Sequence, residues 1–226
     1  MHLIPLLFKK IIQPPRFKYI KRWSTGNADL MVLDIGCGSR SCELTKQWLQ
    51  VREYHGVDKE VWQGDEASYL GIDRFFPADL ETSNLGGIPD GFYDVLIVSH
   101  VIEHLTNALP TLRRLSMKVR SSGVIYIESP TLRTINFPSA IGFLNFYDDP
   151  THKRIYFDSE IVPLLQECGF KVTYAGYRRD WVRVVFLTPL AILLNALFYI
   201  PIRRKLCAYG LWDALGVARV WVAIKM

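Results

Sequence analysis

The chain has 226 residues, of which 50% are hydrophobic and 22% are charged, and its formal net charge is +5. This composition excludes a disordered or low-complexity chain, and the length is sufficient for one domain, residues 1–226, with a large core. The four cysteines form no Cys-x-x-Cys pair, which favours a reduced, cytoplasmic compartment over a secreted protein stabilised by disulfides.

Residues 1–28 are predicted to form a basic amphipathic extension. The first 23 residues contain six Lys and Arg and no acid, and apolar residues lie between them. The charges do not precede the apolar run as they do in a signal peptide. Such a segment can lie on an anionic membrane surface, or it can form a helix that caps a ligand site. We expect no nucleic-acid partner, because the segment lacks the mixture of aromatic and basic residues that strand binding requires.

A glycine turn follows the first predicted strand. Residues 31–35 are apolar apart from Asp34, and Gly36, Cys37 and Gly38 come next. Glycines at this spacing let the backbone approach a ligand closely, although tight turns without a ligand share the pattern. A second strand, residues 54–57, ends in Asp58, where α/β nucleotide folds bind ribose hydroxyls. The sequence therefore predicts an adenosine-containing cofactor at the carboxyl edge of a parallel sheet.

Further predicted elements alternate along the chain. In order they are a strand over 75–80 that includes Asp79, a strand over 93–100, a helix from about 109 to 121–123, a strand over 124–128, a helix over 159–168 that stops at Gly169, and strands over 171–174 and 219–224. The glycine at position 123 is taken as the start of the fifth strand.

As a set, these motifs closely resemble those of the class I S-adenosylmethionine-dependent methyltransferases, most nearly the small-molecule and glycan-tailoring type. The resemblance rests on the run from Val32 to Gly38, on Asp58, on Ala78-Asp79-Leu80 and on the run from Val101 to Leu105. It covers roughly residues 30–178 and the final strand. It implies a doubly wound, seven-stranded, mostly parallel α/β sheet with an antiparallel last strand. One departure is Arg40, where the family usually has a third glycine.

The same resemblance implies a set of residues for binding S-adenosylmethionine. Those for the methionine end are Asp34, Gly36 and Gly38; Asp58 is the partner of the ribose hydroxyls, Asp79 that of the adenine amine, and Ser99 lies beside the sulfonium. Cys37, Lys59 and Leu80 complete the predicted cofactor set.

Two of the five histidines are candidates for a general base or an acceptor contact. His100 directly follows the fourth strand, and His152 lies in a polar loop, residues 148–154. An imidazole titrates near neutral pH and suits proton removal from a hydroxyl. For either residue the alternative is a loop histidine held by hydrogen bonds.

Two rival functions remain open. The run His100-Val-Ile-Glu103-His104 fits the inverted zinc-hydrolase pattern H-x-x-E-H. That pattern needs a helix, whereas here it follows a strand, so we expect no metal. The second rival is a non-catalytic scaffold subunit that binds the cofactor.

An apolar insertion, residues 179–217, separates the last two strands. Val184–Ile202 contains no charged residue and is long enough to span a bilayer. A single crossing is disfavoured, because both flanking strands belong to one sheet, and Pro189, Asn195 and Pro201 interrupt the run. The remaining options are a helix lying in the membrane interface, a re-entrant hairpin, a lid over an apolar substrate, or a dimer face.

The sequence thus predicts a methyltransferase that methylates an oxygen of a small-molecule, glycan or lipid-linked acceptor. We expect it in the cytoplasm, with peripheral contact to the inner membrane face, and a homodimer is compatible with the apolar insertion.

Overall fold

The computed structural model describes residues 11, 13–24, 29–38, 40–59, 71–83, 85–137, 139, 145–198 and 212–226. The chain divides into two compact units, which are described separately. Unit 1 comprises residues 1–15, 130–152 and 176–219; unit 2 comprises residues 16–129, 153–175 and 220–226.

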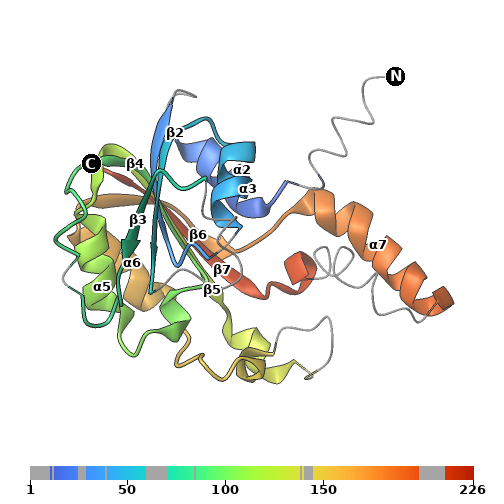
Figure 1. The fold of residues 1–226 in the computed structure, drawn as a ribbon. Coiled ribbons are helices and arrows are strands. Elements are labelled where there is room, and N and C mark those ends of the chain that lie inside the picture. Colours follow the sequence, from blue (N-terminus) through green and yellow to red (C-terminus); the bar gives the residue numbers. More distant parts are fainter. Residues whose placement is uncertain are drawn as a thin grey trace, which may run out of the picture. The chain divides into compact units, whose positions relative to one another are not determined.

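A seven-stranded sheet has the strand order β3-β2-β1-β4-β5-β7-β6 (Figure 1). The strands are β1 (Leu30–Ile35), β2 (Val51–Asp58), β3 (Arg74–Pro77), β4 (Tyr93–Ser99), β5 (Val119–Pro130), β6 (Phe170–Tyr177) and β7 (Ala218–Lys225). Strand β1 pairs in parallel with both β2 and β4, so the strand order reverses at its carboxyl end. Strand β7 runs antiparallel between β5 and β6, which confirms the predicted doubly wound fold.

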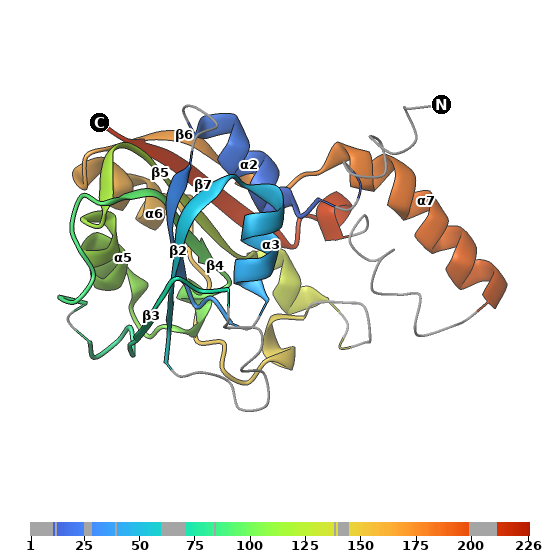
Figure 2. The same ribbon diagram turned by 45° about the horizontal axis from the view of Figure 1, so that its top comes forward.

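Helices of unit 2 cover both faces of the sheet. All six residues of β1 are buried, as expected for a parallel strand covered on both sides. Helices α5 (Ala108–Ser116) and α6 (Asp158–Glu167) pack on one face, and α2 (Pro15–Trp23) and α3 (Ser41–Trp48) on the other (Figure 2). Phe17 and Ile20 of α2 are fully buried. Part of the basic N-terminal stretch therefore belongs to the core of the fold.

The boundary between the predicted helix over 109–123 and the fifth strand was wrong. Helix α5 ends at Ser116, and β5 begins at Val119, before Gly123. The β4–β5 pairing shifts register here, and Ser122 has φ +64°. A Cβ on Gly123 would lie 2.6 Å from Val119 Cγ1, so this glycine serves a bulge inside the strand rather than its start.

Unit 1 contains the short 3-10 helices η2 (Leu132–Asn136) and η3 (Phe146–Asp148) and the helix α7 (Trp181–Phe198). The predicted apolar run 184–202 coincides with α7 as far as residue 198, and residues 199–202 lie outside the described residues. Within the described part of the chain, no helix combines the length and the hydropathy needed to cross a bilayer. Cys37, Cys42 and Cys168 are free thiols, and Cys207 is outside the described residues.

Candidate functional site

The glycine turn after β1 requires two glycines and not three. Gly36 and Gly38 have φ of +64° and +52°, a conformation that glycine adopts without strain. A Cβ on Gly36 would also lie 2.6 Å from Cγ2 of the buried Val101. Arg40, where the resembled family has its third glycine, has φ −110° and immediately precedes α3. The departure from the family pattern therefore leaves the turn intact, because the backbone at Arg40 suits any residue.

Asp34 links the end of β1 to β2 and α3 through side-chain hydrogen bonds. Its side chain is 1% exposed, and Oδ2 accepts hydrogen bonds from Tyr54 Oη at 2.6 Å and from Ser41 Oγ at 2.5 Å. Arg16 in turn donates to Ser41 Oγ at 3.0 Å. Burial raises the pKa of the Asp34 carboxyl, while the charge of Arg16 and the two hydroxyl donors oppose that rise. Asp34 thus fixes the position from which the glycine turn departs.

Cys37, inside the turn, is a neutral thiol. It is 3% exposed, and burial together with the charges of Asp34 and Asp58 raises the pKa of its thiol well above the ordinary value. Its Sγ would lie 2.7 Å from a Cβ on Gly56 of β2. Gly56 was not among the predicted site residues, yet the packing of the turn against β2 depends on it.

Asp58 joins the glycine turn to the end of β2. The main-chain N–H of Gly38 donates to Asp58 Oδ2 at 3.0 Å, and the N–H of Lys59 donates to Oδ1 at 2.8 Å. The carboxylate of the second strand is therefore held at the same edge of the sheet as the turn, where the sequence placed it.

Asp79 is brought to this edge by the pairing of β2 with β3. Asp58 is in register with Pro77, and Lys59 Nζ lies 3.2 Å from Asp79 Oδ2. A hydrogen bond from the main chain of Glu81, followed by that from Lys59, lowers the pKa of the Asp79 carboxyl. Leu80 is 8% exposed and accepts a hydrogen bond from Thr111 on its carbonyl oxygen, so its side chain belongs to the core.

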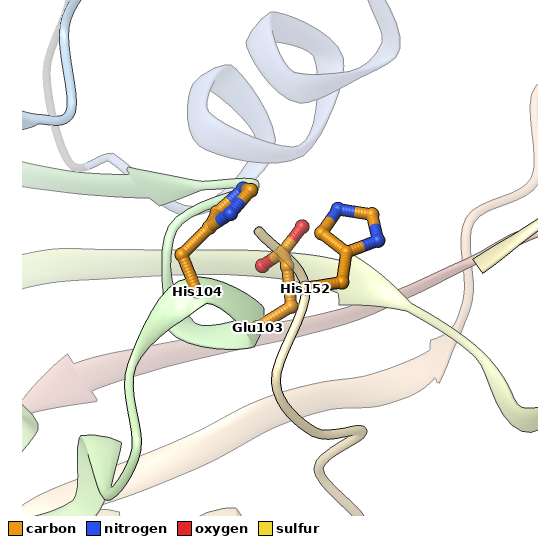
Figure 3. A group of neighbouring side chains, drawn as sticks. All are labelled: Glu103, His104 and His152. Atoms are coloured by element: carbon orange, nitrogen blue, oxygen red, sulfur yellow. The ribbon is translucent and has the colours of Figure 1, made fainter. Parts of the chain in front are cut away.

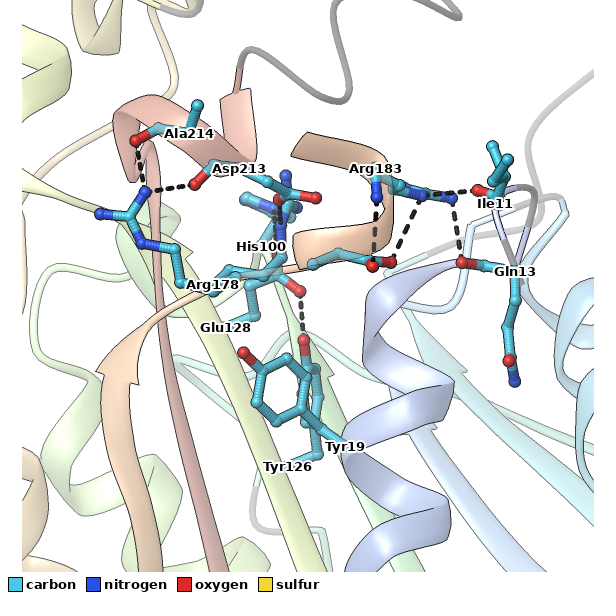
Figure 4. Close-up of polar contacts among 12 residues, drawn as sticks. Ile11, Gln13, Tyr19, His100, Tyr126, Glu128, Arg178, Arg183, Asp213 and Ala214 are labelled. Carbon is cyan, nitrogen blue, oxygen red and sulfur yellow. Dashed lines mark hydrogen bonds and ion pairs between the residues drawn. The ribbon is translucent and has the colours of Figure 1, made fainter. Parts of the chain in front are cut away.

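His100 is held between two buried carboxylates at the carboxyl end of β4. It follows Ser99 with φ +55°, and its ring nitrogens lie 3.0 Å from Glu103 Oε1 and 3.2 Å from Glu128 Oε1. Glu103 is 0% exposed and Glu128 3% exposed. Tyr126 donates to the second oxygen of Glu128 (Figure 4).

These partners determine the charge of the His100 ring. Burial lowers the pKa of the imidazole, but the hydrogen bonds to Glu103 and Glu128 outweigh burial and raise that pKa to about 10. The ring is therefore an imidazolium at neutral pH, with both N–H groups donated. Sequence reasoning missed Glu128, although an acid at the end of a fifth parallel strand follows the same rule that identified Asp58.

The H-x-x-E-H run does not form the α-helix that the inverted zinc-hydrolase pattern requires. Residues Ile102–His104 form one turn of 3-10 helix, from which Glu103 and His104 project (Figure 3). The zinc-hydrolase pattern needs an α-helix that turns both histidines to one side, and here His100 precedes the turn and contacts Glu103. The two histidines of the run are therefore not arranged as that particular pattern requires.

His152 lies in unit 1, where a neighbouring main-chain carbonyl fixes its tautomer. Nδ1 lies 2.7 Å from the carbonyl oxygen of Phe146, and the two rings lie 4.7 Å apart between centroids. A carbonyl oxygen only accepts, so Nδ1 carries the proton and Nε2 carries the lone pair in the neutral ring. Nε2 lies 3.8 Å from Asp149 Oδ2, and the side chain is 15% exposed. Figure 3 draws the ring of His152.

A methyltransferase-domain family model matches residues 8–175. None of the curated proteins compared with the chain matches it. A SAM-dependent methyltransferase from Archaeoglobus fulgidus has 23% identity and a TM-score of 0.58, and the alignment covers 98% of this chain and 99% of that one. An S-adenosylmethionine-dependent methyltransferase from Mesorhizobium loti has 13% identity and a TM-score of 0.62, with 95% and 100% covered.

A third solved structure is the phosphoethanolamine N-methyltransferase 2 of Haemonchus contortus, in complex with phosphomonomethylethanolamine and S-adenosylhomocysteine. It has 14% identity and a TM-score of 0.59, and the alignment covers 97% of this chain and 56% of that one. At these identities the three structures establish similarity of fold, and the family model covers most of the chain.

Proposed function

This chain belongs to the methyltransferase family and uses S-adenosylmethionine, and we propose that it methylates a hydroxyl oxygen of a small-molecule, glycan or lipid-linked acceptor. The observation that carries the cofactor assignment is the hydrogen bond from Gly38 N–H to Asp58, which joins the glycine turn to a carboxylate at the end of β2. Such a pair suits a nucleoside whose ribose hydroxyls are bound by the carboxylate.

The residues present fit the cofactor. Gly36 and Gly38 keep the turn free of side chains, and Asp58 offers a carboxylate to two neighbouring ribose hydroxyls. Asp79 is anionic and forms an ion pair with Lys59, whose Nζ lies 3.2 Å away. Its carboxylate can accept a hydrogen bond from the adenine amine. Asp34, buried beneath the turn, supports the methionine end.

S-adenosylmethionine supplies a methyl carbon made electrophilic by the neighbouring sulfonium. The protein must hold the acceptor oxygen in line with that carbon and remove its proton; well-oriented reactants gain about 7–11 kcal/mol from proximity. We assign proton removal to His152, because its Nδ1–H is donated to the Phe146 carbonyl and Nε2 is the basic nitrogen. Nε2 would accept the proton of the acceptor O–H, and bound S-adenosylmethionine would supply the methyl group to the oxygen.

His100 has a different role in this proposal. A ring with a pKa of about 10 is already protonated at neutral pH and is a poor base. We assign His100 to the polar lining of the acceptor site, where its positive charge offsets the negative charges of Glu103 and Glu128.

The test uses S-adenosylmethionine with a tritiated methyl group and paired acceptors that differ only in a hydroxyl, amine or carboxyl group, including lipid-linked glycans. The position of the methyl group in the product is read by mass spectrometry. Label found on oxygen supports the proposal. Label found only on nitrogen or carbon would overturn O-methylation, while the cofactor assignment would stand.

A further inference from the structure

Helix α7 has an exposed side that is apolar. The side chains of six large apolar residues on it are 41–67% exposed: Trp181, Val185, Phe186, Leu190, Ile192 and Leu193. The buried side instead contains Arg183 and Leu187, each 5% exposed. A helix on the surface of a soluble protein normally has the opposite arrangement, with polar residues facing water. An exposed row of this kind indicates a surface that meets another apolar phase.

The start of α7 is fixed to the N-terminal segment within unit 1. Arg183 Nε donates to the carbonyl oxygen of Ile11 at 2.8 Å, and its terminal nitrogen donates to that of Gln13 at 3.0 Å (Figure 4). Asp180, itself 5% exposed, lies 3.6 Å from Arg183 Nε. The N-terminal stretch and the apolar helix are therefore joined by two hydrogen bonds from Arg183 to main-chain carbonyls, and the ion pair with Asp180 holds Arg183 in place.

Charge is unevenly divided between the two units. Unit 1 contains 10 of the 27 Lys and Arg and 4 of the 22 acids, which gives +6; unit 2 contains the other 17 and 18, which gives −1. No acid occurs between Asp180 and Asp213, and the four charged residues of that stretch, Arg183, Arg203, Arg204 and Lys205, are all basic. The unit with the exposed apolar helix is thus also the cationic one.

We propose that α7 docks unit 1 on an anionic lipid bilayer, with the helix lying in the interface. Its exposed apolar side chains would enter the acyl boundary, and the net charge of +6 on unit 1 would attract it to anionic headgroups. A second copy of the chain fits less well, because it would oppose one +6 unit to another. Nucleic acid would complement the positive charge of unit 1, but it would leave the exposed apolar side chains of α7 in water and therefore fits less well. The inference does not depend on which atom is methylated.

Flotation of the full chain with lipid vesicles tests the proposal. We expect the wild type to float with vesicles of phosphatidylcholine and phosphatidylglycerol, and to float less as salt is raised. Leu193→Gln, alone or with Trp181→Gln and Phe186→Gln, should reduce the bound fraction at every salt concentration. Lys9→Gln and Lys10→Gln should weaken binding about fivefold each at low salt and less at high salt.

Matched controls separate this surface from general stickiness. Met117→Gln alters an apolar side chain of unit 2 that is 48% exposed, close to the 54% of Leu193, and Lys171→Gln removes an exposed charge of unit 2. Both should float like the wild type. Hydrogen exchange of the wild type supplies a test without any substitution, since vesicles should protect the amides of residues 181–198.

The proposal is overturned if the folded wild type stays at the bottom of the gradient with every vesicle composition, or if vesicles leave α7 exchange unchanged. It is also overturned if the triple variant floats normally. If the protein is instead a homodimer that does not bind vesicles, and Leu193→Gln dissociates it, the apolar side of α7 is a dimer interface.

Discussion

The main-chain N–H of Gly38 donates to Oδ2 of Asp58 across 3.0 Å, so the glycine turn after β1 and the acid at the end of β2 form one structural element. Asp58 has two tasks as a result: it fixes the turn, and it presents its carboxylate at the sheet edge where we propose that the cofactor binds.

Replacing Asp58 with alanine should weaken S-adenosylhomocysteine binding about ten- to a hundredfold, because a charge-assisted contact is worth about 1.5–3 kcal/mol. Isothermal titration measures the change. Asp29→Ala is the control, since Asp29 lies before β1, at the opposite edge of the sheet. An unchanged dissociation constant with a normal circular dichroism spectrum would remove Asp58 from the site.

Alanine at Gly36 should cost more stability than alanine at Gly38. Both positions have positive φ, but only at Gly36 does a Cβ also meet Val101, at 2.6 Å. We expect a loss of about 2–4 kcal/mol at Gly36 and about 1–2 kcal/mol at Gly38. Arg40→Gly, which restores the family pattern, should bring no gain in cofactor affinity, because Arg40 has an ordinary φ. Urea unfolding and titration of each variant decide; equal losses at the two glycines would contradict the packing argument.

The charge of His100 should make stability depend on pH in the alkaline range. Its pKa in the folded protein is about 10, above the ordinary value of 6.5. The imidazolium therefore contributes its full stabilisation below about pH 6.5, and that contribution falls as pH rises towards 10. His100→Gln should flatten the fall, and Glu128→Gln should lower the pKa of the ring, as read by NMR titration of the histidine protons. A wild-type His100 that titrates near 6.5 would show that the two glutamates do not hold the proton.

His152→Ala should reduce turnover about 10²–10⁴-fold, as expected for loss of a general base, and leave cofactor affinity nearly unchanged. Phe146→Leu retains the carbonyl that orients the ring and removes the aromatic ring that packs against it, so it is the matched control for packing. Equal activity of wild type and His152→Ala would make His152 a structural loop residue.

The sequence could predict those features that depend on residues close together in the chain. The strand over 31–35, the glycine turn and Asp58 follow from local pattern and from the rule that ligands bind at the carboxyl edge of a parallel sheet. The charge of His100 could not be predicted in the same way, because Glu128 lies 28 positions away and only the β4–β5 register brings it to the ring. Gly123 was misread because a bulge and a strand start both favour glycine, and only packing against Val119 distinguishes them.

Strand β7 enters the sheet between two strands that are synthesised before it. Forty residues, 178–217, separate the end of β6 from the start of β7, and at about 5–20 residues per second their translation takes about 2–8 seconds. Throughout that interval β5 has no partner on one side, and its unpaired amides can pair with another nascent chain. The length of the insertion that contains α7 therefore sets how long each new molecule depends on protection from aggregation at the ribosome.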